Sequence, residues 1–295
     1  MKVLNFGSLN LDYVYRISHI VKPGETITSK SLETFSGGKG LNQSIAMAKA
    51  GIEVYHAGLI GKDGMQLLDT CKANNIHTDF IEVTDEKTGN AMIQVDEAAE
   101  NSIILFPGAN RKNHKEFVDA VLSHFGQGDL LVLQNEINLN EYMIDQAYQK
   151  GMQIAMNPSP FDQNVVKCAL DKVTYFFINE IEGEMMTGEK NPEKVLEILS
   201  KKYPEGKIIL TLGKRGAWYQ NRNKRCFQRI FPVKAVDTTA AGDTFTGFFL
   251  KMMQSGASEE EALRIASLAS SITVSRKGAS DSIPSMKEVE ASPLF

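Results

Sequence analysis

The chain has 295 residues, of which 42% are hydrophobic and 23% are charged, values that exclude wholesale disorder and predict a folded globular protein. Lys and Arg number 32 against 36 Asp and Glu, and the resulting net charge of −4 argues against a dedicated nucleic-acid-binding protein. Three widely spaced cysteines, Cys71, Cys168 and Cys226, favour a reducing compartment over a disulfide framework. There is no secretion-signal pattern and no apolar run of about 18 residues, so we expect a cytoplasmic protein without a membrane partner.

The first part of the chain predicts a strand, a helix and then further strands. We expect a short buried strand over residues 2–7 and a helix over 41–50, which Gly51 ends. Another strand is expected over 53–60. Residues 91–95 and 102–106 flank a short polar turn, a pattern that predicts a β-hairpin.

After Asn110, short apolar runs alternate with helical patterns. Strands are expected at 130–133, 154–156, 175–178 and 208–210, helices at 139–149, 162–170 and 180–202, and two long helices at 243–255 and 258–275. This alternation predicts an α/β fold, a doubly wound and mostly parallel sheet with helices on both faces. Segments 11–35 and 88–108, with approximate bounds, carry strands that do not fit this sheet. We expect one α/β domain over 1–295, in which these segments form a small β-sheet lid over the carboxyl edge of the large sheet, where ligands of such folds bind.

A glycine-rich segment precedes the first predicted helix, with the sequence Ser36-Gly37-Gly38-Lys39-Gly40-Leu41-Asn42. Glycines allow a backbone to come close to a ligand, and the start of a helix presents free N–H groups. Lys39 and Asn42 can point into the same space. The segment is therefore either a ligand-binding turn or simply a glycine-rich turn ahead of a helix.

A second segment, DTTAAGDT at 237–244, opens a strongly amphipathic helix. The N–H groups of the small residues Ala240, Ala241 and Gly242 would form an anion pocket, assisted by the helix dipole. Asp243 at the mouth of this pocket could cap the helix, or it could take a proton from an attacking hydroxyl group. A base beside an anion pocket is what phosphoryl transfer requires. We expect the dipole and the N–H groups to keep Asp243 ionised at neutral pH.

Motifs of several other nucleotide-dependent proteins are missing from the sequence. Gly183 and Gly188 have the glycine spacing of a Walker A motif, but Glu189-Lys190 follows instead of Lys-Ser/Thr. No GxGxxG follows the first predicted strand, and the five histidines show no metal-ligand spacing. These observations argue against a P-loop NTPase, a dinucleotide-dependent dehydrogenase and a histidine metal centre.

Together, the two glycine-rich segments resemble the two signatures of the ribokinase-like (PfkB-type) carbohydrate kinases. They are GGKGLNQ at 37–43 and VDTTAAGDTF at 236–245. Further stretches match the family in order and distance, so that the resemblance covers nearly the whole chain. These stretches are residues 7–12, 23–26, 107–110, 157–160, 179–182 and 211–216.

The resemblance implies roles for individual residues. Sugar-binding positions of the family match Asn10, Asp12, Gly38, Lys39, Asn42 and Glu136. Asp243 matches the catalytic base, and Ala240, Ala241 and Gly242 match the anion hole. Nucleotide-binding positions match Asn179, Thr211, Gly213 and Gly216, and Glu182 matches an acidic residue tied to Mg²⁺ and phosphate handling. A monovalent-cation site matches Asp237, Thr239, Thr273, Arg276, Gly278 and Ser282, mostly through backbone carbonyls.

The implied function is that of an ATP-dependent sugar kinase with Mg²⁺ and K⁺ as cofactors, and we expect it to convert D-ribose to D-ribose 5-phosphate. Asp12, Asn42 and Glu136 offer the carboxylate and amide partners that sugar hydroxyls need. The alternatives are a kinase of this family for another neutral sugar or a nucleoside, and a non-enzymatic sugar sensor on the same fold. Asn179 and Glu182 also fit a helix capping box that needs no ligand. The exposed edge and face of the lid sheet predict a homodimer formed through the lid.

Overall fold

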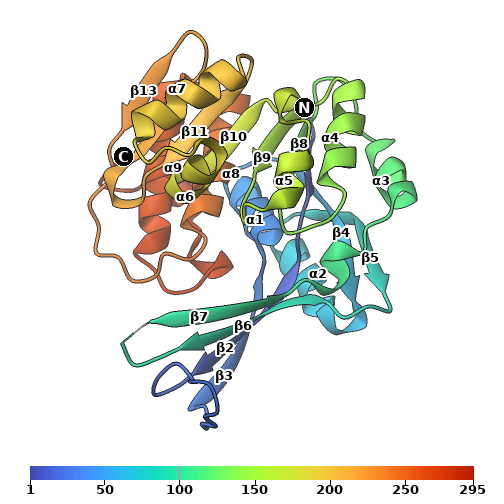
Figure 1. Cartoon of the computed structure of the whole chain (residues 1–295), viewed down its shortest axis with the longest axis vertical. Coiled ribbons are helices and arrows are strands. Elements are labelled where there is room, and N and C mark those ends of the chain that lie inside the picture. Colours follow the sequence, from blue (N-terminus) through green and yellow to red (C-terminus); the bar gives the residue numbers. More distant parts are fainter. Residues whose placement is uncertain (99) are drawn as a thin grey trace.

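The computed structural model describes residues 1–98 and 100–295, so Ala99, in the turn of the predicted hairpin, lies outside the described residues. The described residues form a nine-stranded sheet and a four-stranded sheet that projects below it in Figure 1. The order of strands in the large sheet is β13 (Arg225–Gln228), β12 (Ala217–Gln220), β11 (Lys207–Thr211), β10 (Tyr175–Asn179), β9 (Gln153–Asn157), β8 (Leu130–Gln134), β1 (Val3–Phe6), β4 (Val54–Gly61) and β5 (His77–Thr84). All neighbours from β11 to β5 pair in parallel, whereas β12 and β13 are antiparallel.

The chain changes direction across the large sheet at β1. From β1 it proceeds to β4 and β5 on one side, and it later returns to β8 on the other side. In doubly wound sheets the crevice at such a switch point, at the carboxyl ends of the strands, is where ligands bind. The predicted fold class is confirmed, and it places the ends of β1 and β8 next to each other.

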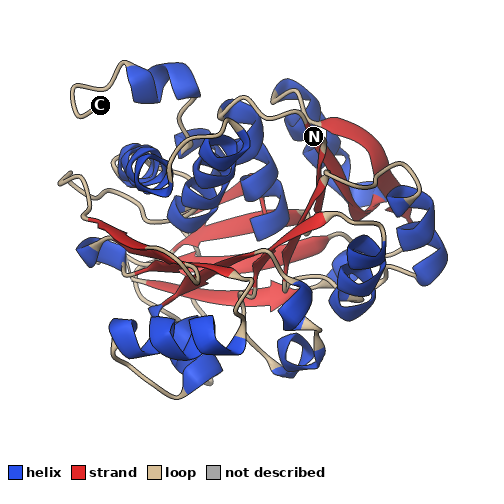
Figure 2. Cartoon of the chain, turned by 90° about the horizontal axis from the view of Figure 1, so that it is seen from above, coloured by secondary structure: helices blue, strands red, loops and turns tan. Residues whose placement is uncertain are grey.

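Helices cover both faces of the large sheet (Figure 2). One face is covered by α1 (Lys39–Lys49), α2 (Met65–Ala73), α8 (Ala241–Gln254), α9 (Glu259–Val274) and α10 (Met286–Glu290). The opposite face is covered by α3 (Lys115–Leu122), α4 (Asn140–Gln149), α5 (Gln163–Lys167), α6 (Glu180–Thr187) and α7 (Pro192–Lys202). No helix among the described residues combines the length and the apolar character needed to cross a bilayer.

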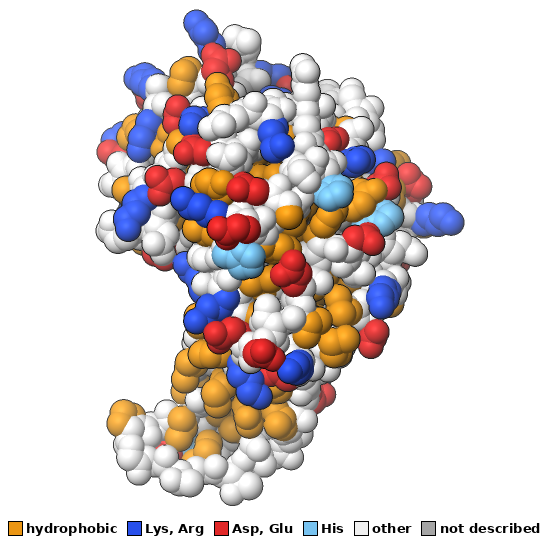
Figure 3. Space-filling model, turned by 90° about the vertical axis from the view of Figure 1, so that its right-hand side faces the viewer, with side chains coloured by type: hydrophobic (Ala, Val, Ile, Leu, Met, Phe, Trp, Pro, Cys, Tyr) orange, Lys and Arg blue, Asp and Glu red, His pale blue; other side chains and the backbone are white. Residues whose placement is uncertain are grey.

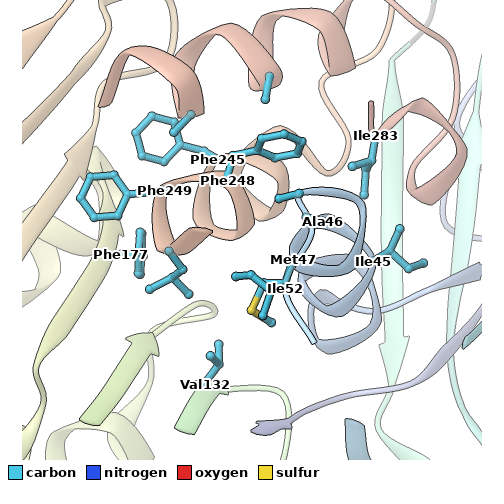
Figure 4. Close-up of a cluster of buried hydrophobic side chains, with 14 of the residues drawn as sticks. Ile45, Ala46, Met47, Ile52, Val132, Phe177, Phe245, Phe248, Phe249 and Ile283 are labelled. Carbon is cyan, nitrogen blue, oxygen red and sulfur yellow. The ribbon is translucent and has the colours of Figure 1, made fainter. Parts of the chain in front are cut away.

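The two glycine-rich segments are brought together by the packing of α1 against α8. Figure 4 shows Phe245, Phe248 and Phe249 of α8 in the hydrophobic cluster that also contains Ala46 and Met47 of α1. These apolar side chains are at most 4% exposed, so their burial supplies a large share of the hydrophobic driving force at this face. Because the two helices pack here, both of their amino ends lie at the same cavity.

The smaller sheet has the strand order β3 (Ser31–Gly37), β2 (Asn10–Arg16), β6 (Gly89–Val95) and β7 (Asn101–Phe106). Strands β2 and β6 pair in parallel, and the β2–β3 and β6–β7 pairs are antiparallel. The expectation that two distant segments pair as a separate sheet is therefore confirmed. Strand β3 extends two residues beyond the predicted segment and ends at Gly37, directly before α1.

Several elements differ from the prediction. The helix expected over 180–202 is two helices, because Gly188 adopts a left-handed conformation (φ 77°) that ends α6, and Asn191 caps α7 ahead of Pro192. Helices α2 and α3, the edge strands β5 and β13, and β12 beside β13 were not predicted. The edge strands lack a continuous apolar run, since much of β5 and β13 is only partly buried or exposed.

Candidate active site

A cavity of about 570 Å³ lies between the carboxyl edge of the large sheet and the smaller sheet. It is lined by all the predicted sugar-binding and catalytic residues and by part of the other predicted sets: Asn10, Asp12, Gly38, Lys39, Asn42, Glu136, Ala240, Ala241, Gly242, Asp243, Asn179, Glu182, Thr211 and Thr239. Within the described part of the chain, its lining does not include Gly213, Gly216, Asp237, Thr273, Arg276, Gly278 or Ser282. Residues that are up to about 230 positions apart in the sequence thus meet at one place.

Glu136 lies where α1 begins, just after β8. Its Oε2 accepts hydrogen bonds from the backbone N–H of Lys39 (3.0 Å) and from the Ser8 hydroxyl. Ser8 in turn accepts from the N–H of Gly40 (3.1 Å). A Cβ on Gly40 would lie 2.2 Å from the backbone nitrogen of Ser8, so only glycine lets α1 start this close to the loop after β1. The helix dipole favours the negative charge of Glu136 at this position.

Asp12 and Asn10 enter the cavity from β2. A Cβ on Gly37 of β3 would lie 2.0 Å from Asp12 Oδ2, so the glycine makes room for the carboxylate. Asn10 Oδ1 accepts from Asn110 Nδ2 (2.7 Å), and Asn110 Oδ1 accepts from the N–H of Leu9 (3.0 Å). These bonds fix the orientation of the Asn10 amide before any ligand is bound.

The cavity shifts the pKa of its charged groups. Burial raises the pKa of Asp12 to about 7, and the negative charge of Glu136 adds to the rise. Burial by itself would lower the pKa of Lys39, but the carboxylates of Asp243, Glu136 and Glu182 outweigh it and raise that pKa. Lys39 is therefore the positive charge that balances several buried carboxylates.

Asp243 lies in the first turn of α8 and is 6% exposed. The helix has Ala240 as its N-cap, and the Asp243 carboxylate accepts side-chain hydrogen bonds from α1 instead of capping α8. Gln43 Nε2 donates to Oδ1 (3.0 Å) and Asn42 Nδ2 donates to Oδ2 (3.3 Å). The capping interpretation of Asp243 is thus wrong.

Burial raises the pKa of Asp243, while Lys39, Gln43 and Asn42 act to lower it and Glu136 adds to the rise. The helix dipole and backbone N–H groups alone would lower this pKa, and the shift is in the opposite direction because desolvation of the carboxylate is the largest effect. The ionisation of Asp243 at neutral pH stays a prediction. A carboxylate with a raised pKa is a stronger base than an exposed aspartate.

The start of α8 presents backbone donors to the cavity. Ala240 is left-handed (φ 59°), a conformation that costs a non-glycine residue about 1 kcal/mol or more and that is typical of functional sites. The helical ladder begins with Thr244 N–H donating to Ala240 O (2.8 Å), so the N–H groups of Gly242 and Asp243 are not committed to the helix. The N–H of Ala241 donates to Thr238 O over a long 3.3 Å. Open space surrounds Gly242, where an added Cβ would meet no atom within 4 Å.

The predicted nucleotide-binding residues divide into two groups. Asn179 caps α6 and forms the full capping box with Glu182: Glu182 N–H donates to Asn179 Oδ1 (3.0 Å), and Asn179 N–H donates to Glu182 Oε2 (2.7 Å). The capping interpretation of this pair is confirmed, and both residues also line the cavity. Thr211 lines it from the end of β11, whereas Gly213 and Gly216 lie in the turn between β11 and β12.

The predicted cation residues gather in two adjoining loops. Asp237 Oδ1 accepts from the N–H (2.9 Å) and the hydroxyl (2.7 Å) of Thr239, and its Oδ2 accepts from the N–H of Gly278 (3.2 Å). The N–H of Arg276 donates to Thr273 O (3.0 Å), and the Arg276 side chain turns to Glu288 (2.8 Å). The Ser282 hydroxyl donates to Ala279 O (2.6 Å). The structure therefore brings Asp237, Thr239 and Gly278 into direct contact.

Sequence reasoning assigned no role to several residues that shape the cavity. Ser8 and Asn110 hold Glu136 and Asn10, and both stood in stretches that matched the family pattern. The aliphatic side chains of Ala91, Ile93, Ile103 and Leu105 line the cavity from β6 and β7. Their alternation along the predicted hairpin was the signal that could have assigned them to the cavity face.

The sequence matches the pfkB family carbohydrate kinase model over residues 1–286. The chain belongs to the pfkB family of carbohydrate kinases, and the predicted family and class of enzyme are confirmed.

Individual relatives are similar along nearly their whole length. The ribokinase of Haemophilus influenzae is 35% identical over 292 residues, which cover 96% of this chain and 95% of that protein. The crystal structure of ribokinase from Thermotoga maritima has a TM-score of 0.89 and 33% identity, covering 99% of this chain and 98% of that one. The structure of Arabidopsis thaliana ribokinase complexed with ribose and ATP has a TM-score of 0.87 and 30% identity, covering 98% of this chain and 97% of that one.

Proposed function

We propose that this protein is an ATP-dependent kinase that transfers the γ-phosphoryl group to the primary hydroxyl of D-ribose and forms D-ribose 5-phosphate. The observation that carries the proposal is a cavity in which carboxylate, amide and ammonium side chains suited to binding hydroxyl groups adjoin a buried carboxylate and a helix amino end. The similarity to ribokinases, one of them complexed with ribose and ATP, supports the choice of sugar.

A neutral polyol suits the polar side chains of the cavity. Asn42 is 6% exposed, and its Oδ1 is a buried acceptor without a hydrogen-bond partner among the described residues. A sugar hydroxyl would satisfy this oxygen, which otherwise costs about 1–3 kcal/mol. Asp12 and Glu136 accept further hydroxyl hydrogens, and their charges would repel the phosphate of a phosphorylated sugar.

The chemical step uses groups that flank the same space. Asp243 accepts the proton of the attacking hydroxyl, since its carboxylate is buried in the first turn of α8, beside the uncommitted N–H groups, and its pKa is raised. The N–H groups at the start of α8, with Gly242 leaving open space in front of them, stabilise the γ-phosphoryl oxygens. The ammonium group of Lys39 balances the charge that develops between sugar and phosphate.

ATP lies toward Asn179, Glu182 and Thr211, with Gly213 and Gly216 shaping the turn that follows β11. The described residues contain no cluster of three or more metal-ligating side chains. Mg²⁺ would then be held mainly by ATP phosphates and water, with Glu182 as the nearby carboxylate. Bound in this way, Mg²⁺ would neutralise phosphate charge.

We propose a K⁺ site in the loops that hold Asp237 and Thr239. Hard, oxygen-only ligands are available there: the Asp237 carboxylate, the carbonyls of Thr239, Thr273, Arg276 and Gly278, and the hydroxyl of Ser282. A cation at this position would fix the loop that leads into Ala240. K⁺ would thereby stabilise the anion hole without contacting the substrate.

The smaller sheet is proposed to act as a lid and as the contact of a homodimer. One of its faces lines the cavity, and the other carries Leu32, Met92, Ile104 and Phe106, which are 46–61% exposed. Figure 3 shows hydrophobic side chains gathered on this projecting part of the molecule. Burying them between two copies would remove an apolar patch from water.

The three free cysteines and the use of ATP fit a cytoplasmic setting.

A coupled assay of ADP formation across a panel of acceptors tests the function. The panel contains D-ribose, 2-deoxy-D-ribose, other pentoses, hexoses, nucleosides and ribose 5-phosphate. We expect D-ribose to give the highest kcat/KM, with mass spectrometry and NMR placing the phosphate on the primary hydroxyl. Turnover with nucleosides alone would favour a nucleoside kinase. Sugar binding without any turnover would favour a sensor.

A further inference from the structure

A chain of buried amides lies behind the Asp243 carboxylate and takes no part in the steps above. Gln43 of α1 donates from Nε2 to Asp243 Oδ1 (3.0 Å), and Gln43 Oε1 accepts from Gln134 Nε2 (2.7 Å). Gln134, at the end of β8, also donates to Asn5 Oδ1 of β1 (2.9 Å). Gln43, Gln134 and Asn5 are each 0% exposed. The Asp243 carboxylate is thus tied to the neighbouring strands β8 and β1 of the large sheet.

The hydrogen bonds at Asn5, the end of the amide network remote from Asp243, determine which group donates and which accepts at every bond of the network. Asn5 Nδ2 donates to Gly40 O (2.6 Å) and to Ser44 Oγ (2.7 Å). The Ser44 hydroxyl therefore donates to His56 Nδ1 (2.8 Å), and His56 Nε2–H donates to Gly7 O (3.2 Å). Burial lowers the pKa of His56 to about 4, which keeps the ring neutral with one proton.

None of the three side-chain amides can be flipped by 180°. A flip would place a donor against a donor, or an acceptor against an acceptor, at one of the hydrogen bonds. Gln134 and Asn5 each commit both hydrogens of their NH₂ groups, so their orientation is determined. Because the NH₂ group of Gln134 donates to Gln43, the side-chain oxygen of Gln43 must face Gln134. The NH₂ group of Gln43 must then face Asp243. Gln134 Oε1 is a buried acceptor without a partner among the described residues, so Gln134 is held by the two bonds that its NH₂ group donates.

We propose that Gln43, held by Gln134, is a positioning residue that fixes the Asp243 carboxylate for proton acceptance, an inference that rests on the proposed kinase function. With Oδ1 engaged by Gln43, the other oxygen, which accepts a long bond from Asn42 (3.3 Å), meets the substrate hydroxyl. General-base catalysis depends on this alignment, because a base displaced by about 1 Å can lose about 100-fold in rate.

Charged groups from several elements face Asp243. Lys39 of α1 favours its ionised form, and Glu136 after β8 opposes it. Glu182 of α6 acts on Lys39. The N–H donated by Gln43 adds to the effect of Lys39, so its removal should raise the pKa of Asp243 further. The acidic limb of the kcat profile should then move to higher pH.

The test compares Gln43→Met and Gln134→Met, which keep side-chain length and remove the amides. We expect Gln43→Met to lower kcat about 10- to 100-fold with little change in the KM for ribose, and to shift the acidic limb upward by about one pH unit, as expected for one lost hydrogen bond to a carboxylate. Gln134→Met should lower kcat by a smaller factor. Because Gln134 acts through Gln43, the double variant should be no slower than Gln43→Met alone.

Gln220→Met on β12 is the control, since Gln220 also donates from a side-chain amide, to Ser200 Oγ (2.7 Å), and does not line the cavity. Its kcat and pH profile should stay unchanged. The pKa of Asp243 is also measured directly by NMR of carboxyl-labelled aspartate, with Asp243→Asn assigning the signal, and it should rise in Gln43→Met. The wild-type protein could be active while the folded Gln43→Met and Gln134→Met variants keep its kcat, its acidic limb and its NMR titration. That result would overturn the positioning role of Gln43 and leave the kinase function standing. A wild-type protein inactive with every acceptor would overturn the kinase function and the catalytic meaning of the network together.

Discussion

The raised pKa of Asp12 should make sugar binding depend on pH near neutrality. Burial raises this pKa to about 7, and the negative charge of Glu136 adds to the rise. An ionised carboxylate accepts hydrogen bonds from two sugar hydroxyls, whereas the protonated form gives up part of that capacity to its own proton. Protonation of Asp12 therefore competes with the binding of ribose.

The magnitude follows from the ionised fraction of Asp12. At a pKa of about 7 this fraction falls from about 90% at pH 8 to about 10% at pH 6. The KM for ribose should therefore rise about tenfold over this range as the pH is lowered. Glu136→Gln removes the smaller cause of the raised pKa and leaves burial in place, so the midpoint should move to lower pH. Asp12→Asn should have a high KM that does not depend on pH.

Calorimetry gives a second measure of the same linkage. At pH 7 about half of the Asp12 side chains are protonated, so binding of ribose should release about half a proton per sugar, and much less at pH 8. The number of protons is obtained by titration in two buffers with different ionisation enthalpies. A ribose KM that is constant between pH 6 and 8, or binding without proton release at pH 7, would refute the reasoning. Asp12→Asn, with no proton to release, is the control.

Other predictions address the base, the cation and the dimer. Asp243→Asn should lower kcat by about 10²–10⁴, the usual share of general-base catalysis, while calorimetry still detects ribose and ATP; near-normal kcat would exclude Asp243 as the base. Replacing K⁺ by tetramethylammonium at constant ionic strength should lower kcat, and Asp237→Ala should abolish the difference; equal rates of the wild type in both salts would count against the cation site. Light scattering at micromolar concentration should give a homodimer, and Ile104→Lys a monomer, whereas a monomeric wild type would rule out pairing through the lid.

The sequence predicted those parts of the fold that depend on local pattern. Strands β8 to β11 are short, continuous apolar runs because both of their faces are covered by helices. The edge strands β5 and β13 carry no such run, since a strand that is partly exposed needs no continuous apolar sequence. The break between α6 and α7 depends on turn chemistry at Gly188 and Pro192, which a helical pattern over 180–202 conceals.

The candidate site was predictable where its residues sit in compact motifs. Clusters of small and polar residues at strand ends and helix starts contribute little to a hydrophobic core. The segments near Lys39 and Asp243 therefore indicated a ligand-binding site. The amide network was not predictable, because Gln43 and Asp243 are 200 positions apart and the spacing of single glutamines carries no signal. Only the packing of α1 on α8 makes them neighbours.

The pKa of Asp243 shows how packing can reverse the direction of a shift expected from local structure. At the start of α8, the dipole and N–H groups would favour an ionised carboxylate of low pKa. In the folded chain, the side chain instead turns toward Gln43, and its burial raises the pKa. Removal from water strengthens Asp243 as a base, and it also makes the alignment of the carboxylate depend on the few donors that remain, Gln43 above all. The same burial therefore gives Asp243 both its basicity and its dependence on the amides behind it.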